Sequence, residues 1–301
     1  MVSDDTEHTV LLCRALMRHP DNVDAFLREL AWGLKWWLLG APAGIGWATL
    51  RAIIRLWLGF SPRKSGVMSA GNGPAMRIAA AGILFADDLE KLRLYVQAAT
   101  RLTHRDPKAL TGAMAVALTA AHRTRHALGR EADPNPRIQD LAQIDRNDEE
   151  WQGLMKDVQS GLDRQLSLQE FAQTLGLSRG VSGYMFYTVP VCLYALYRHA
   201  GDFKTGMESL LNLGGDTDTV GAVYGAIAGM DGTIPEEWVR NLRDFPLSMK
   251  FLERQARALS SVAASRTPVH PGHFPWYAVP FRNAFFFFVV IGHCLRRIIP
   301  C

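Results

Sequence analysis

The spacing of apolar residues constrains the fold of this chain more than any other feature of its sequence. Apolar residues recur three and four positions apart along most of the chain, as they do on one face of an α-helix. The segments with this spacing are 10–18, 23–39, 47–58, 75–86, 89–102, 109–128, 150–162, 167–174, 188–200, 203–212, 219–230 and 247–262. Sustained alternation of β-branched residues, which would indicate strands, is missing. The pattern therefore predicts an all-α protein, a compact domain of many helices.

The chain divides into a long helical part and a shorter tail. Prolines recur between residues 265 and 280, which favours an extended linker ahead of an aromatic run. We therefore expect a helical domain over 1–262, followed by a Pro-rich linker and an aromatic C-terminal helix over 263–301 that folds back over the domain. The acidic segment 131–149 contains prolines and few apolar residues, so it is predicted to be a surface loop.

Composition excludes several classes of protein. The chain has 301 residues, of which 48% are hydrophobic and 21% are charged, and these values are typical of a globular protein. The net charge of +4 is small and the basic residues are dispersed, so no nucleic-acid partner is expected. The four cysteines lack the paired spacing of a zinc or disulfide framework, so we expect reduced thiols. The first residues lack the pattern of a secretion signal, which predicts a cytoplasmic location.

Two apolar stretches, 36–50 and 284–291, raise the question of a membrane. Both are shorter than the span of roughly 20 residues that a helix needs to cross a bilayer. Two interpretations of the second stretch stay open. It forms a buried core or interface helix, or it makes a weak contact with a membrane surface or a partner through residues 284–299.

Two clusters of oxygen-bearing side chains each precede a helical segment. They are Ser3-Asp4-Asp5-Thr6 and Asp216-Thr217-Asp218-Thr219. Converging carboxylates and hydroxyls suit Mg²⁺ or Ca²⁺. The alternative is helix capping, because Ser, Thr and Asp are the preferred N-cap residues, and Asp4 and Glu7 have the spacing of a capping box. His8 is expected to be exposed or paired with an acid.

A third motif, Ser69-Ala70-Gly71-Asn72-Gly73-Pro74-Ala75-Met76-Arg77, combines glycines with a helix start. Gly71 and Gly73 would let the backbone approach a ligand, and Pro74 suits the first position of a helix whose free N–H groups attract anions. The motif is consistent with a phosphate-binding loop. An ordinary turn is the alternative, since Gly and Asn are common in turns.

Taken in order, the motifs of the chain resemble those of the ADP-ribosylglycohydrolase family. They are Ser3–Thr6, Ser69–Arg77, Thr103–Pro107, Ser182–Tyr184 and Gly214–Ala222. The most specific is Gly-Gly-Asp-Thr-Asp-Thr, which Ile234-Pro235-Glu236-Glu237-Trp238 follows at the usual distance, and the resemblance spans roughly residues 3 to 242. It implies an all-α fold with two Mg²⁺ ions in a central cleft, and cleavage of the bond between ADP-ribose and an acceptor.

The resemblance also implies roles for individual residues. The metal ligands would be Ser3, Asp4, Asp5, Asp216, Asp218 and Thr219. Contacts to the substrate would come from Ser69, Gly71, Asn72, Gly73, His104, Ser182, Gly183 and Tyr184. The candidate catalytic acids are Asp4, Asp5 and Asp218, and spacing does not identify which one is the base. For His104 a structural cation at a helix end is the alternative, and for Tyr184 it is core packing.

The chain departs from the family pattern at its start. In the family, a helix and a glutamate precede the first acidic cluster, whereas this cluster begins at residue 3. We therefore expect an N-terminally incomplete domain with poorly anchored ligands. The function expected is Mg²⁺-dependent hydrolysis of an ADP-ribosylated protein or a small ADP-ribose conjugate. The alternatives are a non-catalytic module that binds ADP-ribose or a nucleotide, and a structural helical protein whose acidic clusters only cap helices.

Overall fold

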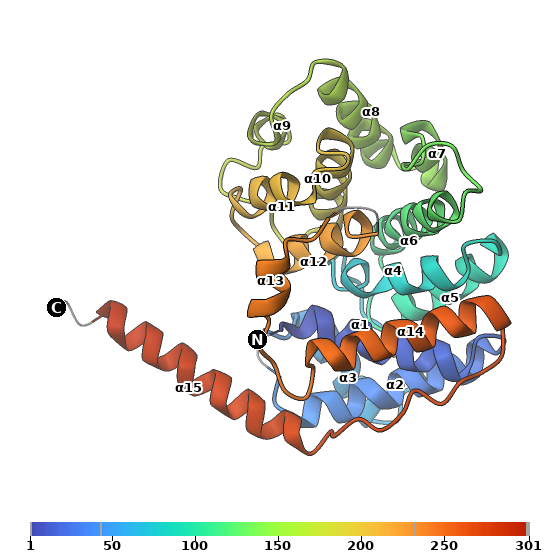
Figure 1. Cartoon of the computed structure of the whole chain (residues 1–301), viewed down its shortest axis with the longest axis vertical. Coiled ribbons are helices and arrows are strands. Elements are labelled where there is room, and N and C mark those ends of the chain that lie inside the picture. The colour runs from blue at the N-terminus through green and yellow to red at the C-terminus, as the bar shows by residue number, and fades with distance from the viewer. Residues whose placement is uncertain (1, 43, 231–232, 299–301) are drawn as a thin grey trace.

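The computed structural model describes residues 2–42, 44–230 and 233–298, and its regular elements there are all helical (Figure 1). The helices are α1 (Asp4–Arg18), α2 (Val23–Leu39), α3 (Trp47–Trp57), α4 (Ala75–Leu84), α5 (Leu89–Arg101), α6 (Pro107–Ala127), α7 (Ile138–Ala142), α8 (Glu149–Asp163), α9 (Leu168–Thr174), α10 (Met185–Arg198), α11 (Phe203–Leu211), α12 (Thr217–Ala228), α13 (Glu236–Asn241), α14 (Met249–Ser265) and α15 (Ala278–Ile298). A short 3₁₀ turn, η1 (Gln143–Asp145), follows α7. The predicted all-α class is confirmed.

Side-chain caps fix where several helices begin. Asn22 accepts a hydrogen bond from the backbone N–H of Ala25 at the start of α2, and Asp88 does the same for Lys91 in α5. Ser167 and Glu170 form a reciprocal capping box at the start of α9. These caps explain why most helices begin close to the residue that the periodicity predicts.

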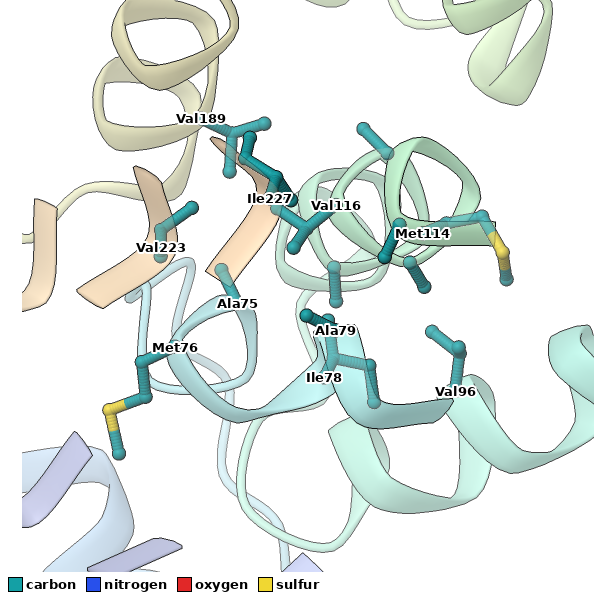
Figure 2. Close-up of a cluster of buried hydrophobic side chains, with 14 of the residues drawn as sticks. Ala75, Met76, Ile78, Ala79, Val96, Met114, Val116, Val189, Val223 and Ile227 are labelled. Atoms are coloured by element: carbon teal, nitrogen blue, oxygen red, sulfur yellow. The ribbon is translucent and has the colours of Figure 1, made fainter. Parts of the chain in front are cut away.

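Helix α4 lies at the centre of the fold, against α1, α5, α6 and α12. Nearly all its residues are buried, and Figure 2 shows Ala79 and Ile78 beside side chains of neighbouring helices. Gly82 makes the closest approach, because a Cβ atom there would lie 2.2 Å from the carbonyl oxygen of Ala117 in α6. The small residues of α4 therefore let α6 pack directly on it, and this packing sets the position of the loop before α4.

The predicted surface loop 131–149 is wrong in part, because it contains α7 and η1. Ile138 and Leu141 are buried, and the indole N–H of Trp151 donates to the carbonyl of Leu141 over 3.0 Å. So short a helix produces no clear apolar period, which explains why the sequence pattern misses α7.

The expectation that the tail 263–301 folds back over the domain holds only for the linker after α14, which returns along α1 (Figure 1). The backbone N–H of Val269 donates to the carbonyl of Met17 over 2.9 Å, and the Arg14 guanidinium donates to the carbonyl of Gly272 over 2.9 Å. Helix α15 then runs away from the helical body (Figure 1).

The aromatic residues of α15 are not part of the core of this chain. The side chains of Phe281, Phe285 and Phe288 are 77%, 63% and 69% exposed, so the interpretation of 284–291 as a buried core helix is wrong. Within the described ranges, no helix has the length and apolar character needed to cross a bilayer. Residue 299 of the predicted contact segment, and Cys301, lie outside the described residues. Of the predicted thiols, Cys13 and Cys192 are free, and Cys192 is buried.

Candidate active site

The two acidic clusters meet although they lie far apart in the sequence. One carboxylate oxygen from each of Asp4, Asp5 and Asp218 lies within 4.8 Å of the others. Asp4 and Asp5 occupy the first turn of α1, and Asp218 the first turn of α12. Because α1 and α12 both pack on α4, their N-terminal ends come together. The predicted convergence of the two clusters is thus a geometric feature of the fold.

Neither cluster caps its own helix. Ser3 and Asp216 occupy the N-cap positions of α1 and α12, yet neither side chain makes a capping hydrogen bond. The Ser3 hydroxyl instead donates to Asp5 Oδ2 over 2.5 Å. The Asp216 carboxylate accepts from the amide Nδ2 of Asn72 over 2.7 Å. The Asp4–Glu7 capping box that belongs to the alternative interpretation does not form either, since Glu7 accepts from the indole N–H of Trp37 over 2.6 Å.

Mutual repulsion and burial make this site unfavourable for negative charge. Burial, with a further contribution from the nearby carboxylates of Asp5 and Asp218, raises the pKa of Asp4 to about 7. Burial likewise raises the pKa of Asp5, with a smaller contribution from Asp218, and burial is also the main cause that raises the pKa of Asp216. The nearby Thr219 hydroxyl lowers the pKa of Asp5 and Asp216.

The same site is chemically suited to a hard cation. Asp5 Oδ1 is buried and accepts no hydrogen bond from any part of the chain that the structure describes. A buried carboxylate oxygen without a donor is costly, and a divalent cation would both coordinate it and relieve the repulsion. The donors are all oxygens, the set that Mg²⁺ and Ca²⁺ prefer. The residues present therefore fit the metal that the sequence implies.

A series of backbone hydrogen bonds holds the motif loops beside one another. The N–H of Asn72 donates to the carbonyl of Gly183 over 2.9 Å, and the N–H of Met185 donates to Ala70 over 2.8 Å. On the other side, the N–H of Asp216 donates to the carbonyl of Val181 over 2.7 Å. The loop 69–74, the loop 181–184 and the start of α12 thus form one continuous surface.

Glycine is needed where these loops cross most closely. Gly215 has a φ of +86°, and a Cβ atom there would lie 2.2 Å from the carbonyl oxygen of Val181. This geometry explains the second glycine of the Gly-Gly-Asp-Thr-Asp-Thr motif. Gly183 is similarly close to the acidic cluster, because its Cβ would lie 3.2 Å from Asp216 Oδ2.

Asn72 joins the glycine loop to the acidic cluster. Its side-chain amide donates to Asp216 Oδ2 and to Thr188 Oγ1, over 2.7 and 3.0 Å. The side chain is therefore committed to protein partners. Ser69 and Ser182 border the loop, and each hydroxyl accepts a backbone N–H two residues later, from Gly71 and Tyr184.

His104 lies beneath the glycine loop as a neutral side chain. A Cβ atom on Gly71 or Gly73 would come within 3.1 Å of its ring, and the residue is 3% exposed. Burial, assisted by the Arg77 guanidinium, lowers the pKa of His104 to about 3. Burial and the nearby Arg77 guanidinium therefore favour a neutral imidazole over the alternative of a structural cation at a helix end.

Arg77 and His8 were not predicted as a buried pair. The guanidinium of Arg77 is buried, donates to Thr103 Oγ1 over 2.8 Å and lies 3.1 Å from Nδ1 of His8. His8 is fully buried, so the expectation of an exposed or acid-paired His8 is wrong. The position of Arg77 at the end of the third motif could have indicated a functional role for it. Sequence spacing does not show, however, that α1 covers Arg77 and brings His8 beside it.

Tyr184 stands at the edge of the loop surface rather than in the core. Its phenol O–H donates to Glu150 Oε1 over 2.8 Å and accepts from Lys108 Nζ over 3.0 Å. Its ring is half-buried and lies edge-on to Tyr187 at 5.0 Å. Lys108 and Glu150 were missed as neighbours of this position, and Glu150 follows a segment predicted to be a loop.

The N-terminal turn is anchored, contrary to the expectation of loosely held ligands. The backbone N–H of Val2 donates to Asp244 Oδ2 over 2.9 Å, and the carbonyl of Val2 accepts from the guanidinium of Arg282. The residue that precedes Ser3, Asp4 and Asp5 is therefore held in place by hydrogen bonds.

Comparison with known proteins gives one consistent family. The sequence profile of the ADP-ribosylglycohydrolase family matches residues 1–268. An uncharacterized protein of Archaeoglobus fulgidus is 28% identical over 85% of this chain and 79% of its own length. The ADP-ribosyl-[dinitrogen reductase] glycohydrolase of Rhodospirillum rubrum is 27% identical over 87% of this chain and 80% of its own length.

Two further similarities agree with these. Human ADP-ribosylhydrolase ARH3 is 25% identical over 62% of this chain, and the chain spans 58% of that protein. Among solved structures, an ADP-ribosylglycohydrolase-related protein complex matches with a TM-score of 0.61 and 26% identity, over 89% of this chain and 82% of the other.

Proposed function

Because the chain belongs to the ADP-ribosylglycohydrolase family, whose members are hydrolases, we propose that it is a Mg²⁺-dependent hydrolase of the glycosidic bond between ADP-ribose and an acceptor. The observation that carries the proposal is the convergence of Asp4, Asp5 and Asp218 around a buried carboxylate oxygen without a donor. Carboxylates that only capped helices would not need to repel one another in this way.

The oxygen-bearing side chains of α1 and α12 would hold two Mg²⁺ ions. Asp4, Asp5 and Asp218 are the central ligands, and Ser3, Asp216 and Thr219 complete the set. When bound, the ions would lower the pKa of a coordinated water and orient the ribose hydroxyls. Asn72 keeps Asp216 in place through its 2.7 Å hydrogen bond.

One aspartate of the central group acts as the base in this proposal. Asp4, Asp5 or Asp218 accepts the proton that water loses as its oxygen bonds to the anomeric carbon. The glycosidic bond breaks, and the acceptor leaves with the electron pair and takes up the proton that the aspartate accepted from water. ADP-ribose is released with a hydroxyl at the anomeric carbon.

The loop 69–74 would bind the diphosphate through its backbone. Helix α4 begins just after it, and helix N-termini attract anions. Gly73 would offer its backbone N–H, and Gly71 would exchange its 3.3 Å contact with the Ser69 hydroxyl for the diphosphate, while His104 supports the loop from below. Ser69, Ser182 and Gly183 border the same surface, and the half-buried ring of Tyr184 would stack on adenine.

The acceptor is either a protein side chain or a small conjugate. The name of the Rhodospirillum rubrum relative specifies an ADP-ribosylated protein, dinitrogen reductase, which supports a protein substrate of this kind. The alternative, a module that binds ADP-ribose without turnover, is distinguished by the experiment below.

Release of free ADP-ribose tests the proposal. The purified chain, stripped with EDTA, would be incubated with proteins carrying ADP-ribose on arginine or on serine, with and without added Mg²⁺. We expect release from one of these substrates only after Mg²⁺ is restored. Equal release in EDTA would contradict metal dependence, and calorimetric binding of ADP-ribose without any release would favour the binding module.

A further inference from the structure

The start of α15 contacts the start of α1 through a single arginine. The guanidinium of Arg282 donates to the carbonyl of Val2 and pairs with Glu7 Oε1. It also donates to Asp244 Oδ2 over 2.9 and 3.2 Å. The Arg282 side chain is 10% exposed, and those of Glu7 and Asp244 are 6% and 0% exposed. This buried charged cluster connects residues 2–7 to the start of α15.

The two contacts of Arg282 in the N-terminal region lie on either side of the aspartates of α1. Val2 precedes Asp4 by two positions, and Glu7 follows Asp5 by two positions. Val2 is held on both its polar groups, because its N–H donates to the same Asp244 oxygen that Arg282 contacts. Glu7 is held from a second side by the indole N–H of Trp37. The short segment with Asp4 and Asp5 is therefore fastened at both ends.

Helix α15 is itself held in place beside Arg282, by the next residue along the chain. The Asn283 amide is buried and donates to the carbonyl of Gly40 at the end of α2, over 2.7 Å. The position of the guanidinium thus depends on α2 as well as on α15. Arginine suits this position, because its planar fork presents several donors in fixed directions, whereas lysine is a single point charge.

Metal ligands must keep a fixed geometry. We propose that Arg282 is a positioning residue, which holds the Asp4–Asp5 turn in the geometry that the metal site requires. The C-terminal segment thereby supplies the support that the first turn of α1 needs. The inference rests on the proposed function for the identity of the bound ion.

The test compares Arg282→Gln with Arg266→Gln. Arg266 belongs to the same C-terminal segment, but its guanidinium donates to the carbonyl of Leu84, so it is a matched control away from the acidic cluster. Mn²⁺, a spectroscopic substitute for Mg²⁺, would be titrated into each variant and followed by electron paramagnetic resonance. Loss of a group that orients a metal ligand typically weakens metal affinity about 10- to 100-fold.

We expect Arg282→Gln to weaken Mn²⁺ binding about tenfold or more, and Arg266→Gln to leave it within about twofold. Arg282→Lys should fall between wild type and Arg282→Gln, since lysine keeps the charge but not the fork. Equal Mn²⁺ affinity in wild type and Arg282→Gln would overturn the inference.

A second measurement does not depend on metal. Amide hydrogen exchange of the metal-free protein should show faster exchange for residues 7–10 in Arg282→Gln, with the protection of α6 and α10 unchanged. If Arg282→Gln does not fold, the same measurement on Arg282→Lys applies. Unchanged protection of residues 7–10 would overturn the inference, whereas absence of Mn²⁺ binding in wild type would instead contradict the proposed function.

Discussion

At the scale of single residues, the candidate site depends on carboxylates that the protein brings together against their repulsion. Asp4 is the clearest example, because burial and its acidic neighbours raise its pKa from 3.8 to about 7. Such a group is protonated in the metal-free folded state at a pH where it would be ionised in the unfolded chain. Protons and metal therefore compete for the same oxygens.

This competition predicts a pH dependence of stability. Since the folded state binds more protons at Asp4 than the unfolded state, the contribution of Asp4 to the free energy of unfolding is fully present below about pH 4 and is lost as pH rises to about 7. We expect metal-free Asp4→Asn to lose less stability than wild type over this interval. Thermal unfolding in EDTA from pH 4 to 8 measures the difference. Parallel curves would contradict the environment assigned to Asp4.

The sequence identified the acidic residues of the site, but it did not reveal the burial, protonation and supporting contacts of the residues around them. Carboxylates at two helix starts were visible as clusters, and their resemblance to a family motif connected them. Contacts between distant elements determine the neutral state of His104, the burial of Arg77 and the hydrogen bonds of Arg282 to the first turn of α1. No local pattern encodes such contacts, so sequence reasoning could not find them.

At the scale of elements, the close packing of α4 on α6 determines where the glycine loop lies. Apolar periodicity predicts both helices, yet it does not show that they touch at Gly82. Glycine and alanine contribute little to the apolar periodicity of a sequence. Their role in this packing is seen only in the close approach of α4 to the backbone of α6.

Two glycine substitutions test this packing. Gly82→Ala places a Cβ atom 2.2 Å from the Ala117 carbonyl oxygen, so we expect overpacking to lower the free energy of unfolding by roughly 1–3 kcal/mol. The control is Gly153→Ala in α8, where the new Cβ would meet no atom within 4 Å apart from the backbone of its own helix. It should raise stability by about 0.5–1 kcal/mol, because alanine is the better helix former. Urea unfolding measures both, and a stabilising Gly82→Ala would contradict the packing.

Helix α15 presents an apolar surface without a covering element in the described chain. Residues 266–301 contain no Asp or Glu, and the exposed Phe285 and Phe288 follow the exposed Trp276 and Tyr277. Aromatic residues beside basic ones are typical of helices that lie on anionic lipid surfaces. We therefore predict that this helix contacts an anionic lipid surface, which can take up both the exposed aromatic side chains and the positive charge of the exposed Arg296.

We expect the protein to co-sediment with vesicles that contain phosphatidylglycerol and less with pure phosphatidylcholine. Replacing Phe285 and Phe288 with Ser should weaken this binding, while Leu94→Ser, at an exposed position on α5, should not. Binding unaffected by the double substitution would contradict the role of α15. Self-association that the same substitution abolishes, without vesicle binding, would indicate a second copy as the partner.

At the scale of the whole molecule, three distant parts of the chain build one site. The Asn72–Asp216 hydrogen bond joins the loop before α4 to the start of α12, the first turn of α1 meets them at the acidic cluster, and α15 contacts that turn through Arg282. Order along the sequence predicted which segments belong to the site. The fold was needed to show how they touch, since the supporting contacts come from elements outside the motifs.

The most direct test of the account is calorimetric titration of Mg²⁺ into wild type, Asp218→Asn and the control Asp157→Asn, which changes an exposed acid on α8. Charged ligands supply most of the affinity of a hard-cation site, so we expect Asp218→Asn to lose Mg²⁺ binding. Asp157→Asn should bind like wild type, and circular dichroism should show that all three proteins stay helical. Wild-type affinity in Asp218→Asn would contradict the claim that the starts of α1 and α12 form one metal site.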